Sequence, residues 1–71
     1  MLQELLDRWN EIQKLRSENQ GGNEQDWIAE ELNILEALRI LGCRRIAEVD
    51  VQYLISERHK RMGDLLRKRN G

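Results

Sequence analysis

The side chains of this sequence that could do covalent or metal chemistry are one thiol, one imidazole and a few glutamates. Cys43 is the only cysteine, and a single cysteine near a turn is typical of a small packing residue rather than of a redox or metal site. His59 is the only histidine, and the sequence fixes no serine, cysteine or carboxylate constellation around it. We therefore expect no catalytic residue and a protein that is not an enzyme.

Cofactor and metal sites lack their usual sequence patterns as well. Glu30, Glu31 and Glu36 have no Glu-x-x-His motif beside them, so a carboxylate-bridged metal bundle is not supported. Gly21 and Gly22 follow an expected helix, and neither lysine nor serine comes after them, which indicates a hairpin turn and not a phosphate-binding loop. The sequence predicts neither a cofactor nor a metal ion.

The basic end of the chain is the other candidate site, and its simplest interpretation is structural. Residues 56–71 contain six Arg or Lys, and cations in the last turn of a helix offset the negative end of its dipole. Glu57 and Asp64 lie within the basic flank at helical spacing and are expected to pair with Arg61 and Lys68. A self-paired, solvated face is the favoured interpretation, ahead of an acidic protein partner and of nucleic acid.

Nucleic acid remains the alternative partner because charge is divided unequally along the chain. Residues 1–42 carry a net charge of −5 and residues 43–71 a net charge of +4, although the whole chain is near neutral. Only two Trp, one Tyr and no Phe are available for base stacking. The side chains that could contact phosphates are Arg44, Arg45, Lys60, Arg67 and Lys68.

A helix-turn-helix motif would be the sharpest form of that alternative. In the stretch ILEALRILGCRRIAEVDVQY, Gly42 stands where the turn glycine belongs, and the segment after it could open a recognition helix. However, the motif requires a small residue where Leu38 stands and an apolar one where Glu48 stands. The runner-up function is thus a small transcriptional regulator that uses residues 43–69.

Hydrophobic spacing predicts an all-α fold in one small domain. Apolar residues recur at three- and four-residue steps, and Gly21, Gly22 and Gly42 are the strong breaks. Asn23 and Asp26 have the spacing of an N-cap signal, and Gly42 is suited to ending the second helix. Asp50 is a second possible cap if the last segment breaks after Val49. We expect helices over about 2–19, 24–41 and 44–69, with a turn at 20–23.

Self-association is expected because a chain of 71 residues has a limited core of its own. The last helix is the longest, so its final two turns should project beyond the other two and leave core-type residues uncovered. Arg58 and Arg69 fall within its apolar stripe, where an arginine is expected to meet a carboxylate across an interface. The expected partner-binding residues are Trp9, Leu38, Leu41, Arg58, Met62, Leu65, Leu66 and Arg69.

The sequence thus favours a non-enzymatic adaptor or regulatory module that acts by helix-to-helix association. The preferred partner is a second copy, in a homodimer completed into a helical bundle, or else another helical protein. No stretch approaches the roughly 18 apolar residues of a membrane span, so no membrane association is expected. We expect an intracellular, cytoplasmic protein.

Overall fold

The computed structural model describes residues 1–18 and 23–70, with side chains to Lys68. These residues form three α-helices and one small β-hairpin, in the order α1 (Leu2–Ser17), α2 (Glu24–Ile40), β1 (Arg45–Ile46), β2 (Val49–Asp50) and α3 (Val51–Asn70). The all-α fold expected from the hydrophobic spacing is confirmed, with the hairpin as an addition. The expected turn at 20–23 falls largely outside the described residues.

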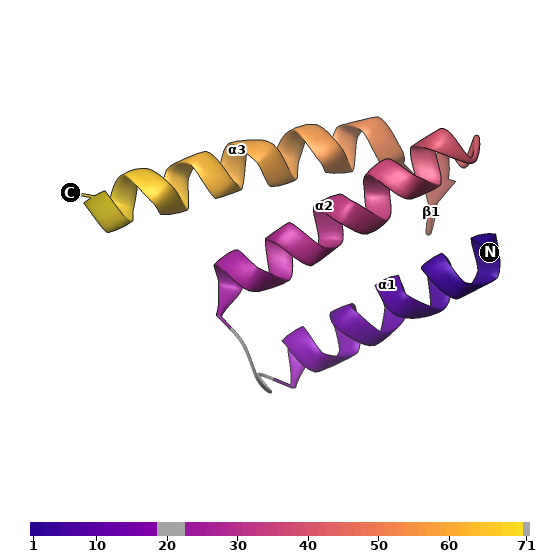
Figure 1. The fold of residues 1–71 in the computed structure, drawn as a ribbon, viewed down its shortest axis with the longest axis horizontal. Coiled ribbons are helices and arrows are strands. Elements are labelled where there is room, and N and C mark those ends of the chain that lie inside the picture. Colours follow the sequence, from indigo (N-terminus) through magenta and orange to yellow (C-terminus); the bar gives the residue numbers. More distant parts are fainter. Residues whose placement is uncertain (19–22, 71) are drawn as a thin grey trace.

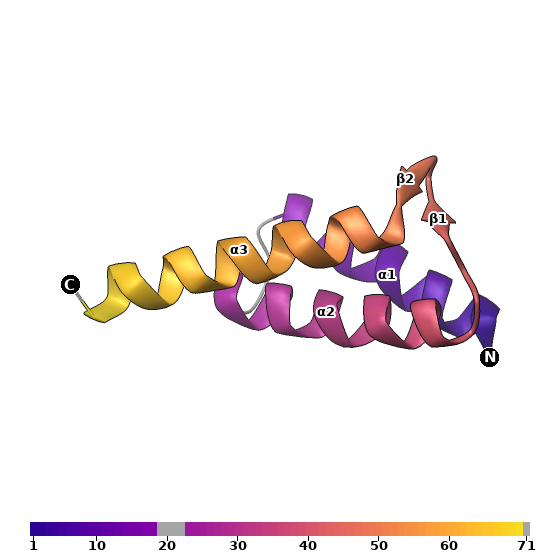
Figure 2. The same cartoon turned by 90° about the horizontal axis from the view of Figure 1, so that it is seen from above.

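Helix α2 is the central element of the fold. The helices run antiparallel in sequence order, and α2 packs against both α1 and α3 (Figure 1). Figure 2 shows the same arrangement from above, with the N-terminus, the end of α2 and the hairpin gathered at one end of the molecule. This position explains why α2 carries apolar residues on more than one side: it has two neighbours to contact.

Both ends of α2 are capped by the residues that the sequence indicated. The side chain of Asn23 accepts a hydrogen bond from the backbone N–H of Asp26 at 2.9 Å, which satisfies one of the free donors of the first turn. At the other end Gly42 has a φ of 89°. The N–H of Gly42 donates to the carbonyl of Arg39, and that of Cys43 to the carbonyl of Leu38, as in a Schellman motif.

The segment after Gly42 differs from the expectation, because it is a hairpin and not the start of a helix. Arg45 pairs with Asp50 and Ile46 with Val49 in an antiparallel register. The connecting residues Ala47 and Glu48 have φ values of 48° and 67°, which is the pattern of a type I′ turn. Helix α3 therefore begins at Val51 rather than near Arg44, and the helix-turn-helix interpretation of this stretch is wrong.

Asp50 starts α3, as the alternative boundary anticipated. Its carboxylate accepts hydrogen bonds from the backbone N–H groups of Gln52 and Tyr53, at 2.7 and 3.4 Å. From this cap α3 continues past the beginning of α2, and its C-terminal turns project from the bundle in both views (Figures 1 and 2). The predicted overhang is therefore present, although the helix that produces it starts later than expected.

The core lies between the three helices and reaches the hairpin. Ile12, Leu35 and Leu38 are fully buried, and Ile46 of β1 joins them. Because Ile46 packs into the core, the hairpin is held by apolar burial as well as by its two residue pairs. The buried cluster consists of Trp9, Ile12, Ile34, Leu35, Leu38, Ile46, Val51 and Leu54.

The left-handed turn yields a first prediction, the effect of Glu48→Gly. A residue with a side chain at positive φ costs about 1–2 kcal/mol, while glycine adopts this conformation freely but loses about 0.5–1 kcal/mol through chain entropy. The substitution is expected to raise the free energy of unfolding by up to about 1 kcal/mol. In a thermal melt this appears as a rise of roughly 4–8 °C per kcal/mol.

Ser56→Gly is the matched control, since Ser56 is exposed in the interior of α3. The same residue type should there lower stability by about 0.5–1 kcal/mol. If both glycine variants destabilised the protein equally, Glu48 would not be held at positive φ in the folded chain.

Candidate interaction surface

One carboxylate, that of Glu31 in α2, is fully buried where the three helices meet. Gln13 and Arg16 of α1 donate to it at 2.5 and 3.0 Å. From α3, Arg58 Nε lies 3.2 Å from Oε1 and Arg58 Nη2 lies 3.4 Å from Oε2. Both oxygens of Glu31 are therefore satisfied by donors from the two helices on either side of α2.

The cations of this cluster have further partners that extend it toward the surface. The Arg58 guanidinium lies 5.7 Å from the centre of the Trp9 ring, within the range of a cation–π contact. Arg16 Nη2 also contacts Glu24 at 2.9 Å, and Arg61 reaches the same carboxylate oxygen at 2.5 Å. The result is a chain of charges that runs across all three helices.

The Glu31 carboxylate is a packing feature and is not accessible to a substrate. Among the described residues no buried side-chain nitrogen or oxygen lacks a hydrogen-bond partner. A general base needs an accessible lone pair near its substrate, whereas Glu31 has no exposed surface. The cluster therefore stabilises one arrangement of the helices.

Cys43 and His59, the other chemically capable side chains, lie in different parts of the fold. Cys43 packs against the core beside the hairpin and donates its thiol hydrogen to the carbonyl of Arg45 at 3.3 Å, whereas His59 is exposed on α3. In the described part of the chain no three His, Cys, Asp or Glu side chains converge as a metal-binding group. None of the helices, over its described residues, has the length and apolar character needed to cross a bilayer.

Three of the expected partner-binding residues are occupied within their own chain. Trp9 and Leu38 are buried in the core. Arg58 does meet a carboxylate, as its place in the apolar stripe indicated, but that carboxylate is Glu31 of the same chain and not of a partner. These three residues are therefore part of the core and its ion cluster. The side chain of Arg69 lies outside the described residues.

A surface of uncovered apolar side chains lies at the hairpin end of the molecule. Leu41 is 47% exposed, although it follows buried Leu38 and Ile34 on the same face of α2 at steps of three and seven residues. Leu2 is 44% exposed in the same way, one turn before Leu5 and Leu6 on the inner face of α1. The apolar faces with which α1 and α2 contact the core thus continue beyond the part of the bundle that other segments cover.

Neighbouring residues enlarge this surface. Met1 is 85% and Ile40 is 78% exposed, and Val49 of β2 is also exposed. Figures 1 and 2 place the start of α1, the end of α2 and the hairpin at the same end of the molecule, with the hairpin directed away from the N-terminus in Figure 2. We call this surface the apolar end; it consists of Met1, Leu2, Ile40, Leu41 and Val49.

Charges of both signs flank the apolar end. Arg44 and Arg45 stand between Leu41 and Val49, and Glu4 and Asp7 follow Leu2 on α1; all four are exposed. Within the described residues none of the four forms an ion pair. A hollow of about 420 Å³ opens beside Arg44, lined by Arg39, Gly42, Cys43, Arg44, Asp50, Val51 and Gln52.

The projecting end of α3 is a second uncovered region, but a smaller one. Leu66 is exposed, whereas Met62 and Leu65 are half-buried. Leu65 lies at a shallow hollow that it shares with Lys68 and with the first residues of α2. The overhang is therefore partly covered by its own chain, and less apolar surface is exposed there than at the apolar end.

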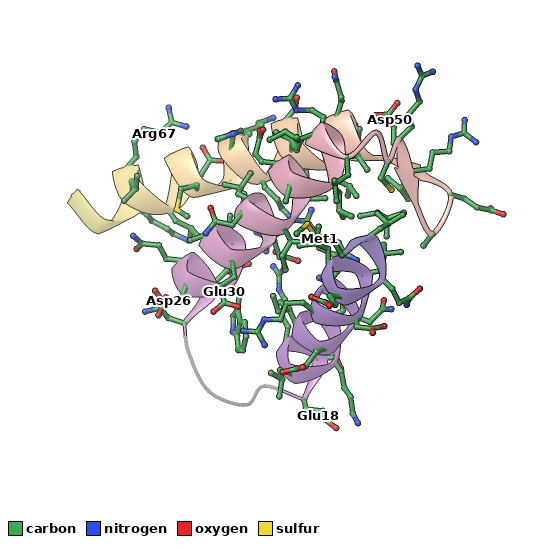
Figure 3. The ribbon with its side chains drawn as sticks, turned by 45° about the vertical axis from the view of Figure 1, so that its right-hand side comes forward. Met1, Glu18, Asp26, Glu30, Asp50 and Arg67 are labelled. Atoms are coloured by element: carbon green, nitrogen blue, oxygen red, sulfur yellow. The ribbon has the colours of Figure 1, made fainter. Side chains whose placement is uncertain are left out.

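The basic residues considered for nucleic acid do not form one face. Arg67 is paired with Asp64 and points away from the other helices (Figure 3). Glu57 pairs with Arg58 and not with Arg61, so the expected pairing along α3 occurs with different partners. Arg44 and Arg45 lie at the hairpin, and Lys60 and Lys68 are exposed on α3.

Comparison with known protein families, with curated proteins and with solved structures found no match for this chain.

Sequence reasoning did not identify Glu31 as the centre of the fold, although a signal was present. Glu31 lies three residues after Ile28 and four before Leu35, within an apolar face of α2. A carboxylate in such a stripe and an arginine in another stripe are natural partners, because a buried charge needs a counter-charge. Reading the two stripes together would have predicted the contact of Glu31 with Arg58.

Removing one partner from the cluster gives a second prediction. Arg58→Met keeps a long apolar stem but leaves Glu31 buried with fewer donors, and breaking a buried pair typically costs about 3–5 kcal/mol. Gln13 and Arg16 remain, so we expect a loss of about 3 kcal/mol in the free energy of unfolding. Urea unfolding followed by helical circular dichroism would measure it.

Arg67→Met is the control, because it removes an exposed pair whose expected contribution is about 0–1 kcal/mol. A third variant, Glu31→Leu with Arg58→Met, removes the uncompensated carboxylate as well and should lose less stability than Arg58→Met alone. Equal losses for Arg58→Met and Arg67→Met would contradict the importance of the cluster.

Proposed function

We propose that this protein is a non-enzymatic interaction module that binds another protein through its apolar end. The main support for the proposal is that the apolar faces of α1 and α2 extend beyond the part of the bundle in which other segments cover them. Leu2 and Leu41 occupy positions that are buried elsewhere along the same helices, yet both are exposed. Concentrated exposed apolar surface of this kind is typical of protein contacts.

The arrangement of the rest of the molecule supports an interaction function over catalysis. The buried side-chain nitrogen and oxygen atoms that the structure describes all have hydrogen-bond partners within the chain. At the apolar end, uncovered apolar side chains have charged side chains beside them, which is the usual anatomy of a protein interface. The proposed contact therefore needs no rearrangement of the core.

Helix-to-helix association remains the proposed mode of contact. The uncovered leucines belong to the ends of α1 and α2, and an amphipathic helix or a second helical bundle can continue their stripes. Of the residues expected to bind a partner, Leu41 belongs to this surface. Leu66, on the overhang, is a separate and smaller candidate.

Site-specific photo-crosslinking tests the proposal. A photoreactive amino acid placed at Ile40, in the full chain and in the cells that produce it, is expected to form covalent adducts with protein. The same probe at Lys14, which is exposed on α1 away from the apolar end, is the control position. Adducts at Ile40 should disappear when Leu41→Asp is added, because a carboxylate in an apolar contact opposes binding.

Helical circular dichroism of the Leu41→Asp variant separates lost binding from lost folding. Leu41 is nearly half exposed, so its replacement should change the free energy of unfolding by less than about 1 kcal/mol. Adducts at Ile40 no more frequent than at Lys14 would contradict the proposed function. Adducts with nucleic acid instead of protein would favour the alternative function.

A further inference from the structure

We propose that the partner of the apolar end is a second copy of this chain, related by a twofold axis, with Arg44 and Arg45 of each copy facing Glu4 and Asp7 of the other. This inference rests on the proposed function and specifies its partner. Its basis is that one end of the molecule carries uncovered leucines and charges of both signs that form no ion pair within the described residues, although Asp7 accepts a hydrogen bond from Gln3 at 2.9 Å. A twofold interface requires such self-complementarity.

The charges at this end satisfy that requirement. Arg44 and Arg45 form no ion pair within the described residues, and the same holds for Glu4 and Asp7. Glu4 lies within one turn of Leu2, and Arg44 lies three residues beyond Leu41. When the apolar ends of two copies meet, the basic side of each can contact the acidic side of the other. Four cross-copy contacts result from two residues of each sign.

The hollow beside the hairpin provides a place for one of these contacts. It is lined by Arg39 and Arg44, and Arg39 already pairs with Glu36 at 3.0 Å. Arg44 is therefore the cation at the hollow that is available to an incoming carboxylate. Asp50 also lines the hollow, but its carboxylate accepts hydrogen bonds from the backbone N–H groups of Gln52 and Tyr53. An acidic side chain of the second copy can therefore pair with Arg44 at this concave site.

The mixed charge also favours a second copy over a polyanion. Glu4 and Asp7 at the same end would repel the phosphates of nucleic acid or of an anionic membrane, whereas a second copy uses both signs. The molecule measures 38 × 24 × 19 Å, so its end is narrower than a standard interface of about 800 Å² per partner requires. We therefore expect weak, reversible dimers at micromolar or higher concentration.

Charge reversal of the two sides gives a specific test. One variant carries Arg44→Glu and Arg45→Glu, and the other carries Glu4→Lys and Asp7→Lys. Each variant alone would place like charges opposite each other in its own dimer, and its dissociation constant should rise about tenfold or more. In an equimolar mixture all four contacts are again attractive, and heterodimers should form with an affinity close to that of the original protein.

Analytical ultracentrifugation over a concentration series, at low and moderate salt, measures the original protein, the two reversed variants and their mixture. The advantage of the mixture should shrink as salt rises, because exposed charges are screened. Circular dichroism checks that each variant is folded, and Arg44→Gln with Arg45→Gln serves as a milder substitute that should weaken the dimer less. Restored association in the mixture is a result that a general loss of folding cannot produce.

The other outcomes overturn the inference in distinguishable ways. Self-association that neither reversed variant weakens would place the dimer contact elsewhere, and its loss in Leu66→Asp would assign it to the overhang. A protein that stays monomeric while Ile40 crosslinks to a different protein would refute the dimer and leave the proposed function standing. A monomer without adducts at Ile40 would refute both. Binding of duplex DNA or anionic vesicles that Arg44→Glu with Arg45→Glu abolishes would replace the second copy with a polyanion.

Discussion

The burial of the Glu31 carboxylate is the constraint on which the rest of the structure depends. A charge removed from water must be compensated by donors of good geometry. Glu31 has no exposed surface, and its donors come from α1 and from α3. Only a packing that brings both helices to the same point of α2 satisfies it, so the cluster favours one arrangement of the three helices among those that apolar contact alone would allow.

This cluster also accounts for how the arginines of the chain are divided between structure and surface. Arg16 and Arg58 are mostly covered and bound to Glu31, and Arg61 is drawn to Glu24. Among the described residues, the Lys and Arg side chains that form no ion pair are Lys14, Arg44, Arg45, Lys60 and Lys68, and of these Arg44 and Arg45 stand beside the apolar end. Residues 43–71 therefore do not form one basic binding face, because Arg58 and Arg61 in the middle of this segment pair with Glu31 and Glu24 of α2.

The bundle is covered unevenly along its length. The core and the ion cluster occupy the middle, where all three helices overlap, and the two ends are formed by fewer elements. At one end α3 projects alone, with Leu66 exposed. At the other end the hairpin buries its own Ile46 in the core but leaves Leu2 and Leu41 uncovered. The proposal of a protein contact at the hairpin end follows from this unequal coverage.

Local signals in the sequence determined the helical class, the caps and most helix boundaries, because these depend on residues within one or two turns of each other. Asn23, Gly42 and Asp50 act as their chemistry indicates. The hairpin was missed because its turn is Ala47-Glu48 and not the Asn-Gly or Asp-Gly pair that marks a type I′ turn, and its stability comes from burying Ile46 among distant residues. The contact of Arg58 with Glu31, the burial of Trp9 and Leu38, and the exposure of Leu41 were likewise decided by the tertiary structure. Helical periodicity shows which face of a helix is apolar, but how far along the helix a neighbour covers that face depends on how segments far apart in the chain pack together.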